Sequence, residues 1–300
     1  MQIVTDQGMD LSTEQLEGLN IHFVPLRINL NGKTYIGGKD LDHETFYKML
    51  SETTSFPVTS QPSPGDFSDL YRELAKDDPD ILSIHISSGL SGTVNSARMG
   101  AEMVPEANVT ILDSKTLSCP FGWQVEAAGR AIQAGWGLDE ITQLLGRIRH
   151  FSEGIFTLAD LKYLIHGGRI SHIKGLMASV LNIKPIIGVA KDDGKYYSWG
   201  QEMSFKRAIH KMVDIVTTKI PLGTMLRVQP LHGNNLPGVE IMKERLNQLY
   251  ECCYDKVVPV APILGAHTGP SIVGMAVAPL DVFNVPELEL TPVAVPVAVG

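Results

Sequence analysis

Short apolar runs alternate with amphipathic stretches along the first half of the chain. The runs at residues 2–6, 80–87 and 108–114 have the length and composition of buried strands, and a longer run at 21–30 is also predicted to be a strand. Apolar positions recur at helical spacing in six stretches: 11–19, 41–50, 63–76, 93–104, 120–135 and 138–151. Strands that alternate with helices through short loops predict a mostly parallel sheet with helices on both faces, a three-layer α/β arrangement.

Three of these helices carry a capping residue at the predicted start. Ser12 has Gln15 three residues further on, which is the spacing of a capping box. Asp42 precedes the next helix, and Ser63 stands directly before Pro64, a residue that favours the first helical position.

The second half of the chain has a mixed order of elements. A hairpin is predicted around Asp193-Gly194. Helices are predicted at 203–219 and 238–250, and strands at 224–233 and 256–263. We therefore predict two domains: an N-terminal α/β domain at 1–152 and a C-terminal α+β domain at 153–285, followed by a tail at 286–300.

Composition and charge exclude several classes of protein. The net charge is -8, and no run of Lys or Arg exceeds two residues, so a nucleic-acid groove is not expected. No apolar run reaches the roughly 18 residues of a membrane span, and the first residues do not resemble a secretory signal. Three cysteines, two of them adjacent, form no disulfide framework. These features predict a soluble protein of the cytoplasm.

Small residues and hydroxyls crowd the loop at 87–92, where a strand passes into a helix. The first backbone N–H groups of a helix have no partner within it, and together with the helix dipole they attract an anion. Glycines such as Gly92 let the backbone approach a ligand, and Ser91 adds a hydroxyl. The loop is therefore a candidate site for a carboxylate or phosphate. A tight turn capped by serine explains the same residues.

Three further stretches supply candidate ligand groups. Thr59 and Ser60 are predicted to lie in extended chain just ahead of a capped helix. His267 sits among glycines and can donate to a carboxylate, and Arg169 follows two glycines. Each residue also has a structural interpretation, as turn chemistry or as a solvated side chain.

One motif that suggests catalytic chemistry is incomplete. The string Gly89-Leu90-Ser91-Gly92-Thr93 approaches a nucleophile elbow, but its last glycine is misplaced. A serine hydrolase acting through Ser91 and His267 remains an alternative, and so does a binder of another carboxylate or phosphate.

No cofactor or metal motif is complete either. Residues 31–35 contain GKT without the earlier glycine of a phosphate-binding loop, because Arg27 occupies that position. No HExxH string and no cluster of His and Asp ligands is present, so we expect neither a metal nor a cofactor.

Taken together and in this order, the strings of the chain resemble the DegV family of bacterial fatty-acid-binding proteins. The matching strings are IVTD, TSQPSPGDF, ISSGLSGTVNSA, ILDSKTLS, LKYLIHGGRIS, LNIKPII with DDGK after it, and AHTGPSIVG. They extend from residue 1 to about residue 280 with family-like spacing, so together they are far more specific than any one of them.

The resemblance implies a two-domain DegV-like fold with a long-chain fatty acid such as palmitate buried between the domains. It assigns the carboxylate to Thr59 and Ser91, with His267 at the same site. It also implies that the protein is not an enzyme but presents the fatty acid to a separate kinase subunit. Residues proposed to line the tunnel for the acyl chain are Ile155, Phe156, Leu158, Leu161, Leu164, Ile165, Leu176, Met177, Val180 and Leu181.

This sequence departs from the family pattern in three places. Met203 stands where many relatives have an arginine, which puts pairing with the usual kinase in doubt. Gln7 follows Asp6 where a serine is usual, close to the expected ligand. The chain also continues past Leu280 for about 20 residues beyond the usual end of the family.

Overall fold

The computed structural model describes residues 1–173 and 183–285.

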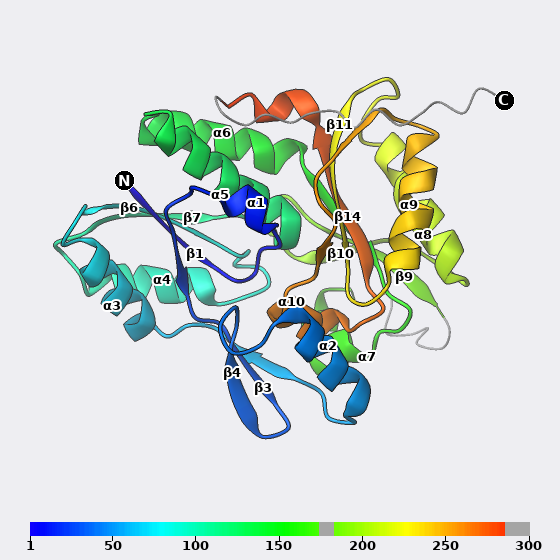
Figure 1. Ribbon diagram of the computed structural model, residues 1–300, viewed down its shortest axis with the longest axis horizontal. Helices are drawn as coiled ribbons and strands as arrows, with labels where there is room; N and C mark the ends of the chain where they lie inside the picture. The colour runs from blue at the N-terminus through cyan, green and yellow to red at the C-terminus, as the bar shows by residue number, and fades with distance from the viewer. Residues whose placement is uncertain (174–182, 286–300) are drawn as a thin grey trace.

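The first sheet is parallel throughout. In this sheet the strand order is β2-β1-β6-β7, and each neighbouring pair is parallel. The strands are β1 (Gln2–Asp6), β2 (Ile21–Val24), β6 (Asp80–His85) and β7 (Asn108–Asp113). The predicted parallel sheet is therefore confirmed, and the carboxyl ends of its strands lie at one edge (Figure 1).

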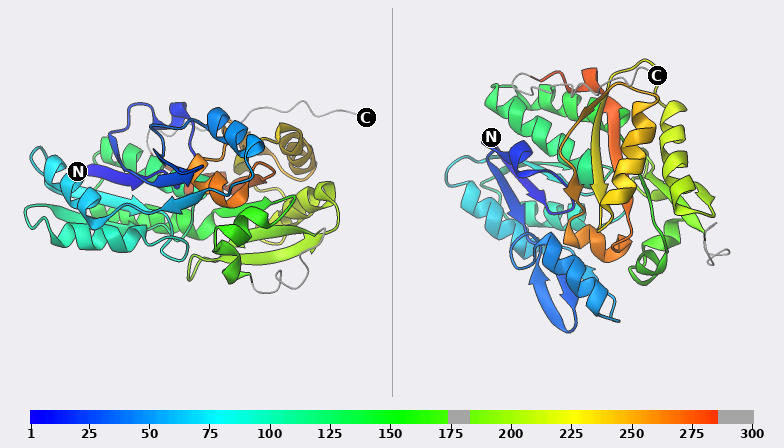
Figure 2. Two further views of the ribbon diagram at one scale, coloured as in Figure 1. Left: turned by 90° about the horizontal axis from the view of Figure 1, so that it is seen from below. Right: turned by 45° about the vertical axis from the view of Figure 1, so that its right-hand side comes forward.

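Helices cover both faces of this sheet. The helices are α3 (Pro64–Leu74), α4 (Thr93–Glu102), α5 (Ser118–Gln133) and α6 (Leu138–Phe151). Successive residues of a strand point to opposite faces. Val4 accordingly packs in a core with Phe67 and Ala97 of α3 and α4, whereas Ile3 packs in a core with Phe121 of α5. This layering is visible in both views of Figure 2.

The predicted strand at 21–30 is wrong as a single element. It is broken at Pro25, which has no N–H to donate to a ladder, and its second half belongs to another sheet. That sheet has the order β4-β3-β5, with β3 (Arg27–Leu30), β4 (Lys33–Ile36) and β5 (Val58–Ser60). Asn31 and Gly32, at φ 55° and 76°, form the turn between β3 and β4, and α2 (His43–Glu52) follows.

A second large sheet is built from residues after 152. Its order is β10-β9-β8-β14-β11-β12, and β13 also pairs with β11. The strands are β8 (Glu153–Thr157), β9 (Lys184–Val189), β10 (Tyr196–Glu202), β11 (Leu226–His232), β12 (Cys252–Tyr254), β13 (Val258–Pro259) and β14 (Val273–Pro279). Parallel and antiparallel pairs occur together, as the mixed order of the sequence predicts. The division into two domains stays a prediction, but this sheet begins where the predicted second domain begins.

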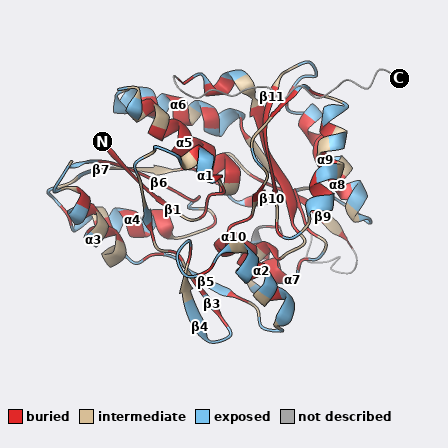
Figure 3. Cartoon of the chain, viewed as in Figure 1, coloured by how far each residue is buried: buried red, intermediate tan, exposed pale blue. Residues whose placement is uncertain are grey.

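The two faces of the second sheet have different partners. One face packs against α8 (Phe205–Thr217) and α9 (Leu236–Asn247), with Ile155 and Met275 in that core. The other face, which includes Phe156, shares a core with α5 and α6 of the first half. Figure 3 shows the buried residues concentrated along the strands between these layers. One continuous apolar layer therefore joins the two halves of the molecule.

The remaining elements are short. They are α1 (Thr13–Leu16), α7 (Lys162–His166), α10 (Pro262–Thr268) and the 3-10 helices Arg169–His172 and Leu280–Phe283. The Ser12 capping box is confirmed, although α1 ends earlier than predicted. The predicted strand at 256–263 is wrong, since only Val258–Pro259 pairs there and Pro262 starts α10. The tail from residue 286 lies outside the described residues.

Candidate functional site

Three distant segments meet around one cavity between the halves of the molecule. The cavity has a volume of about 250 Å³. Thr59 comes from β5, Ser91 from the loop before α4, and His267 from α10, and all three line it. In Figure 1, α10 lies between the first sheet, the β3–β4 hairpin and the second sheet. The other lining residues are Gly8, Leu26, Ser60, Gln61, Ile86, Leu90, Leu117, Arg169, Tyr196, Ile263 and Leu264.

Thr59 and His267 are joined directly. The hydroxyl oxygen of Thr59 and Nε2 of His267 are 2.8 Å apart. Burial, and secondarily the positive charge of Arg169, lower the pKa of His267 to about 4. The imidazole is therefore neutral at physiological pH. Within the described residues its Nδ1 atom is buried without a hydrogen-bond partner.

The glycines before Arg169 let the chain approach that histidine. A Cβ atom on Gly167 would lie 2.1 Å from Nδ1 of His267, and Gly168 has φ 73°. Arg169 donates from Nη1 to the carbonyl of Gly167 at 2.8 Å and from Nε to the carbonyl of Leu90 at 3.2 Å. The arginine thus connects the HGGRIS segment to the loop of Ser91.

The serine loop is held by its own backbone and by a neighbouring threonine. Ser91 donates its N–H to the carbonyl of Ser87 at 3.0 Å, and its hydroxyl is 2.8 Å from the hydroxyl of Thr93. No side chain caps α4, whose N-cap is Gly92. Gly92 does not line the cavity, but a Cβ there would lie 2.2 Å from Oε1 of Gln61, so a side chain would displace Gln61 from the wall.

A buried carboxylate supports the wall behind these groups. Asp6 accepts hydrogen bonds from the N–H groups of Gly8 at 2.8 Å and Ile86 at 3.0 Å, and both of these residues line the cavity. Nδ1 of His85 is 3.0 Å from the same carboxylate. Asp6 therefore ties the end of β1 to the end of β6, which leads into the serine loop.

The cavity adjoins a second, smaller and apolar one. This cavity has a volume of about 30 Å³ and shares Leu117, Tyr196 and Leu264 with the first. Ile155, Phe156 and Met275 are among its other walls, and no ionised side chain lines it. The arrangement places hydrogen-bonding groups at one end and apolar side chains at the other, as a ligand with a polar head and an apolar tail requires.

The predicted tunnel residues divide into four groups. Ile155 and Phe156 line the apolar cavity, whereas Leu158, Leu161 and Leu164 are buried outside the lining of both cavities. Ile165 is 40% exposed. The other four, Leu176, Met177, Val180 and Leu181, lie outside the described residues.

Sequence reasoning missed the residues that join the two cavities. Tyr196 begins the strand after the predicted Asp193-Gly194 turn, and its place beside that turn was the available signal. Leu117 and Leu264 belong to ordinary apolar stretches that the one-dimensional pattern does not distinguish from core.

Within the described residues, the geometry does not assemble a catalytic triad around Ser91 and His267. Nε2 of His267 contacts Thr59, and the hydroxyl of Ser91 contacts Thr93. No carboxylate bonds to Nδ1 of His267 there.

The described part of the chain contains neither a metal-binding cluster nor a membrane-spanning helix. No group of three or more His, Cys, Asp or Glu side chains there is arranged to bind a metal ion. None of its helices combines the length and the apolar character needed to cross a bilayer. Cys119, Cys252 and Cys253 are buried, and none is in a disulfide.

Comparison with known proteins agrees with the sequence strings. The family model described as "Uncharacterised protein, DegV family" matches residues 1–280. A DegV domain-containing protein from Staphylococcus aureus (strain N315) is 34% identical over 275 residues, which cover 92% of this chain and 97% of the relative.

Solved structures of similar proteins share the fold. The structure titled "Fatty Acid Binding of a DegV family Protein from Thermus thermophilus" has a TM-score of 0.84 at 29% identity, covering 93% of this chain and 99% of the other. DegV from Bacillus subtilis, titled a fatty acid binding protein, has a TM-score of 0.82 at 27% identity and covers 92% and 98%. The fold, the order of its motifs and these matches show that the chain belongs to the DegV family.

Proposed function

We propose that the protein binds a long-chain fatty acid, with the carboxylate between Thr59, Ser91 and His267. The observation that carries this proposal is the meeting of these three side chains around one cavity that adjoins an apolar one. The fatty-acid binding described for the proteins from Thermus thermophilus and Bacillus subtilis supports it.

The head of the ligand is matched by neutral hydrogen-bond donors and by one cationic side chain. Hydroxyls of Thr59 and Ser91 donate to carboxylate oxygens, and the imidazole of His267 donates from whichever ring nitrogen carries its proton. Arg169 is the one side chain of the described lining that carries a full positive charge. These groups orient the carboxylate. Ser60 has a supporting place in the same wall, and Gly92 supports the wall from outside by leaving room for Gln61.

The tail supplies most of the affinity. Burial of each CH₂ contributes about 0.8 kcal/mol, so a chain of about 15 carbons contributes about 12 kcal/mol before the cost of ordering it. We place this chain along the line from Tyr196 and Leu264 towards Phe156 and Met275. Such a ligand needs no general base and no metal, which supports a carrier rather than an enzyme.

The partner of such a carrier follows from the family resemblance. We propose that a kinase subunit phosphorylates the exposed carboxylate. Met203, at the position of the usual arginine, is 67% exposed directly before α8. We therefore expect the partner surface to be more apolar than in relatives with the arginine. A cytoplasmic location fits the three cysteines, which form no disulfide.

Mass spectrometry of lipid extracted from the purified protein tests the proposal. We expect a bound long-chain fatty acid, and a higher melting temperature when palmitate is added to delipidated protein. Thr59→Val and Ser91→Ala should each weaken palmitate binding. Ser88→Ala in the same loop, an exposed serine outside the lining, should not. Repeated recovery of empty protein without stabilisation by palmitate or oleate contradicts the proposal.

A further inference from the structure

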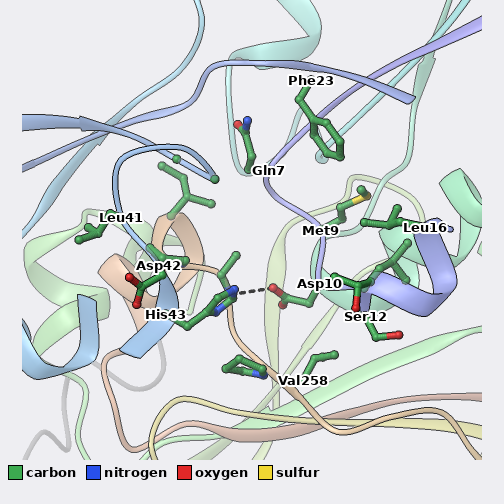
Figure 4. Close-up of a pocket in the computed structure, with 18 of the residues that line it drawn as sticks. Gln7, Met9, Asp10, Ser12, Leu16, Phe23, Leu41, Asp42, His43 and Val258 are labelled. Carbon is green, nitrogen blue, oxygen red and sulfur yellow. Dashed lines mark hydrogen bonds between the residues drawn. The ribbon is translucent and has the colours of Figure 1, made fainter. Parts of the chain in front are cut away.

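A larger pocket lies at the start of α10, where Pro262 and Ile263 line it. Its volume is about 550 Å³, within the range of small-molecule sites. It is formed by the segment after β1, the loop between β4 and α2, and the segment that leads into α10. It shares only Ile263 with the cavity of Thr59 and His267. Figure 4 shows Phe23 and Gln7 on one side of it and His43 and Asp10 on the other.

Every carboxylate that lines this pocket already has partners. Asp10 accepts from the hydroxyl of Ser118 and from the N–H of Ala261 at 2.7 Å. Asp42 accepts from the N–H and the hydroxyl of Thr45, both at 2.8 Å, and so caps α2. The third carboxylate, that of Glu14, is 2.6 Å from the ammonium of Lys256.

Unlike these carboxylates, two hydrogen-bond donors of the pocket remain available to a ligand. The ammonium of Lys39 makes no hydrogen bond or ion pair with any residue that the structure describes. Gln7 uses its carbonyl to accept from the N–H of Leu26 at 3.0 Å, which leaves its amide NH₂ for a ligand. His43 is the exception, because its Nδ1 is 3.2 Å from the carbonyl of Val260 and its ring faces the carboxylate of Asp10 (Figure 4). The unsatisfied groups therefore favour a ligand that carries negative charge.

The rest of the lining is apolar and partly open to solvent. Phe23 is 41% exposed at the pocket although it lies in a strand of the parallel sheet. Met9, Leu16, Leu41 and Val258 form walls around it (Figure 4). An exposed aromatic ring is unfavourable in water, and a ligand stacked on it would remove that apolar surface from water. The ligand thus needs an apolar body as well as an anionic group.

We propose that this pocket is a second ligand site, which binds a small amphiphilic anion with an aromatic or short aliphatic body. The anionic group lies near Lys39 and the amide of Gln7, and the apolar body packs against Phe23. The site also adjoins the structure that holds His267, because Asp10 bonds the N–H of Ala261 at the start of α10 and His267 lies in the same helix.

Titration with the fluorescent probe 8-anilinonaphthalene-1-sulfonate tests this site. The probe has an aromatic body and a single sulfonate, and its emission rises in an apolar pocket. The titration uses the full chain, both as purified and with saturating palmitate. We expect saturable binding of one probe per chain that palmitate does not displace.

Two surface variants locate the probe. Lys39→Glu and Phe23→Ser should each weaken binding by about tenfold or more, the loss of one charged or one stacking contact. Lys48→Glu, an exposed lysine on α2 outside the lining, makes the same change of charge and should leave binding unchanged. Melting curves check that all three variants fold.

Three results would overturn the proposal. They are the absence of saturable binding, displacement of the probe by palmitate, and equal affinity in the wild type, Lys39→Glu and Phe23→Ser. Because the titration is also run without palmitate, it tests this site even if the protein does not bind fatty acids.

Discussion

The hydroxyl of Ser87 donates a 2.8 Å hydrogen bond to the carbonyl of Gly194, so the tip of the β9–β10 hairpin is fixed to the serine loop. The hairpin tip and the serine loop also pack closely at a second point. A Cβ on Gly89 would lie 2.4 Å from the carbonyl oxygen of Asp193. The hairpin continues into Tyr196, which lines the cavity, and the loop continues into Ser91. The second half of the chain thereby positions a candidate ligand residue of the first half.

Gly194→Ala should weaken fatty-acid binding by separating these two segments. Gly194 has φ 69°, and a Cβ there would lie 1.9 Å from Oγ of Ser87. The left-handed conformation alone costs a non-glycine residue about 1–2 kcal/mol. Gly223→Ala is a matched control, because Gly223 has φ 87° and its Cβ would meet nothing within 4 Å. We expect both variants to lose a similar amount from strain.

Palmitate affinity separates the two glycine variants. Only Gly194→Ala should bind palmitate more weakly, by about tenfold or more if the displaced loop loses one hydrogen bond to the carboxylate. Calorimetric titration of both variants, with melting curves, measures this. Equal palmitate affinity in the two variants would show that the hairpin tip does not position Ser91.

Arg169→Gln should affect ligands with a charged head more than ligands without one. The guanidinium lines the cavity and bonds two backbone carbonyls, those of Gly167 and Leu90. A charged hydrogen bond is worth about 1.5–3 kcal/mol, so we expect palmitate to bind at least about tenfold more weakly. Hexadecanol, which has the same chain and no charge, should lose much less.

Arg147→Gln controls for the loss of an arginine that bonds a carbonyl. Nε of Arg147 donates to the carbonyl of Val282 at 3.2 Å, away from the cavity. Competition assays with both ligands on both variants give the comparison. A uniform loss for palmitate and hexadecanol in Arg169→Gln would make the arginine a structural residue only.

Much of the fold follows from local signals in the sequence, because caps and periodicity act within a few residues. The capping box at Ser12, the N-cap at Ser63 and the hairpin at Asp193-Gly194 occur where the sequence predicts them. The β3-β4-β5 sheet was missed because its pairing depends on contacts between β3 and β5, about 30 residues apart. Pro25 was the one local sign that the run at 21–30 divides.

In the candidate site too, local sequence signals identify some residues, whereas others are determined by contacts between distant segments. Thr59, Ser91 and His267 were selected by type, by loop position and by resemblance, and the structure brings them to one cavity. The walls at Leu117 and Leu264 could not be selected, since an apolar side chain at a cavity and one in a core give the same pattern. The pocket at Phe23 and Lys39 has no sequence motif, because its donors and its walls come from segments that are far apart in the sequence.

Leu264→Phe should change the preference for chain length. Leu264 is buried at the junction of the polar and the apolar cavities, so a larger side chain narrows the passage between them. Overpacking of this kind costs about 1–3 kcal/mol in stability, and palmitate must compete for the same space. Octanoate reaches less far into the apolar cavity and should lose less affinity. Displacement assays that yield the ratio of palmitate to octanoate affinity measure the effect, and an unchanged ratio contradicts this path for the tail.

Stability should depend on pH through His267. Its pKa is lowered to about 4 in the folded protein, mainly by burial, whereas an exposed imidazole titrates near 6.5. Between these values the unfolded chain binds more protons, so this residue's contribution is present above about pH 6.5 and is lost as the pH falls towards 4. The shift corresponds to at most about 3 kcal/mol.

Urea unfolding at several pH values measures this contribution when the wild type is compared with His267→Gln. The difference between the two is needed because Asp10 acts in the opposite direction. Burial raises the pKa of Asp10 to about 6, so its contribution to stability is present at low pH and is lost as the pH rises through 6. We expect His267→Gln to lose less stability than the wild type as the pH falls from 6.5 to 4.

His150→Gln, which removes an exposed imidazole on α6, should retain the wild-type dependence. Parallel curves for the wild type and His267→Gln would mean that the imidazole beside Thr59 accepts a proton as readily in the folded protein as in water.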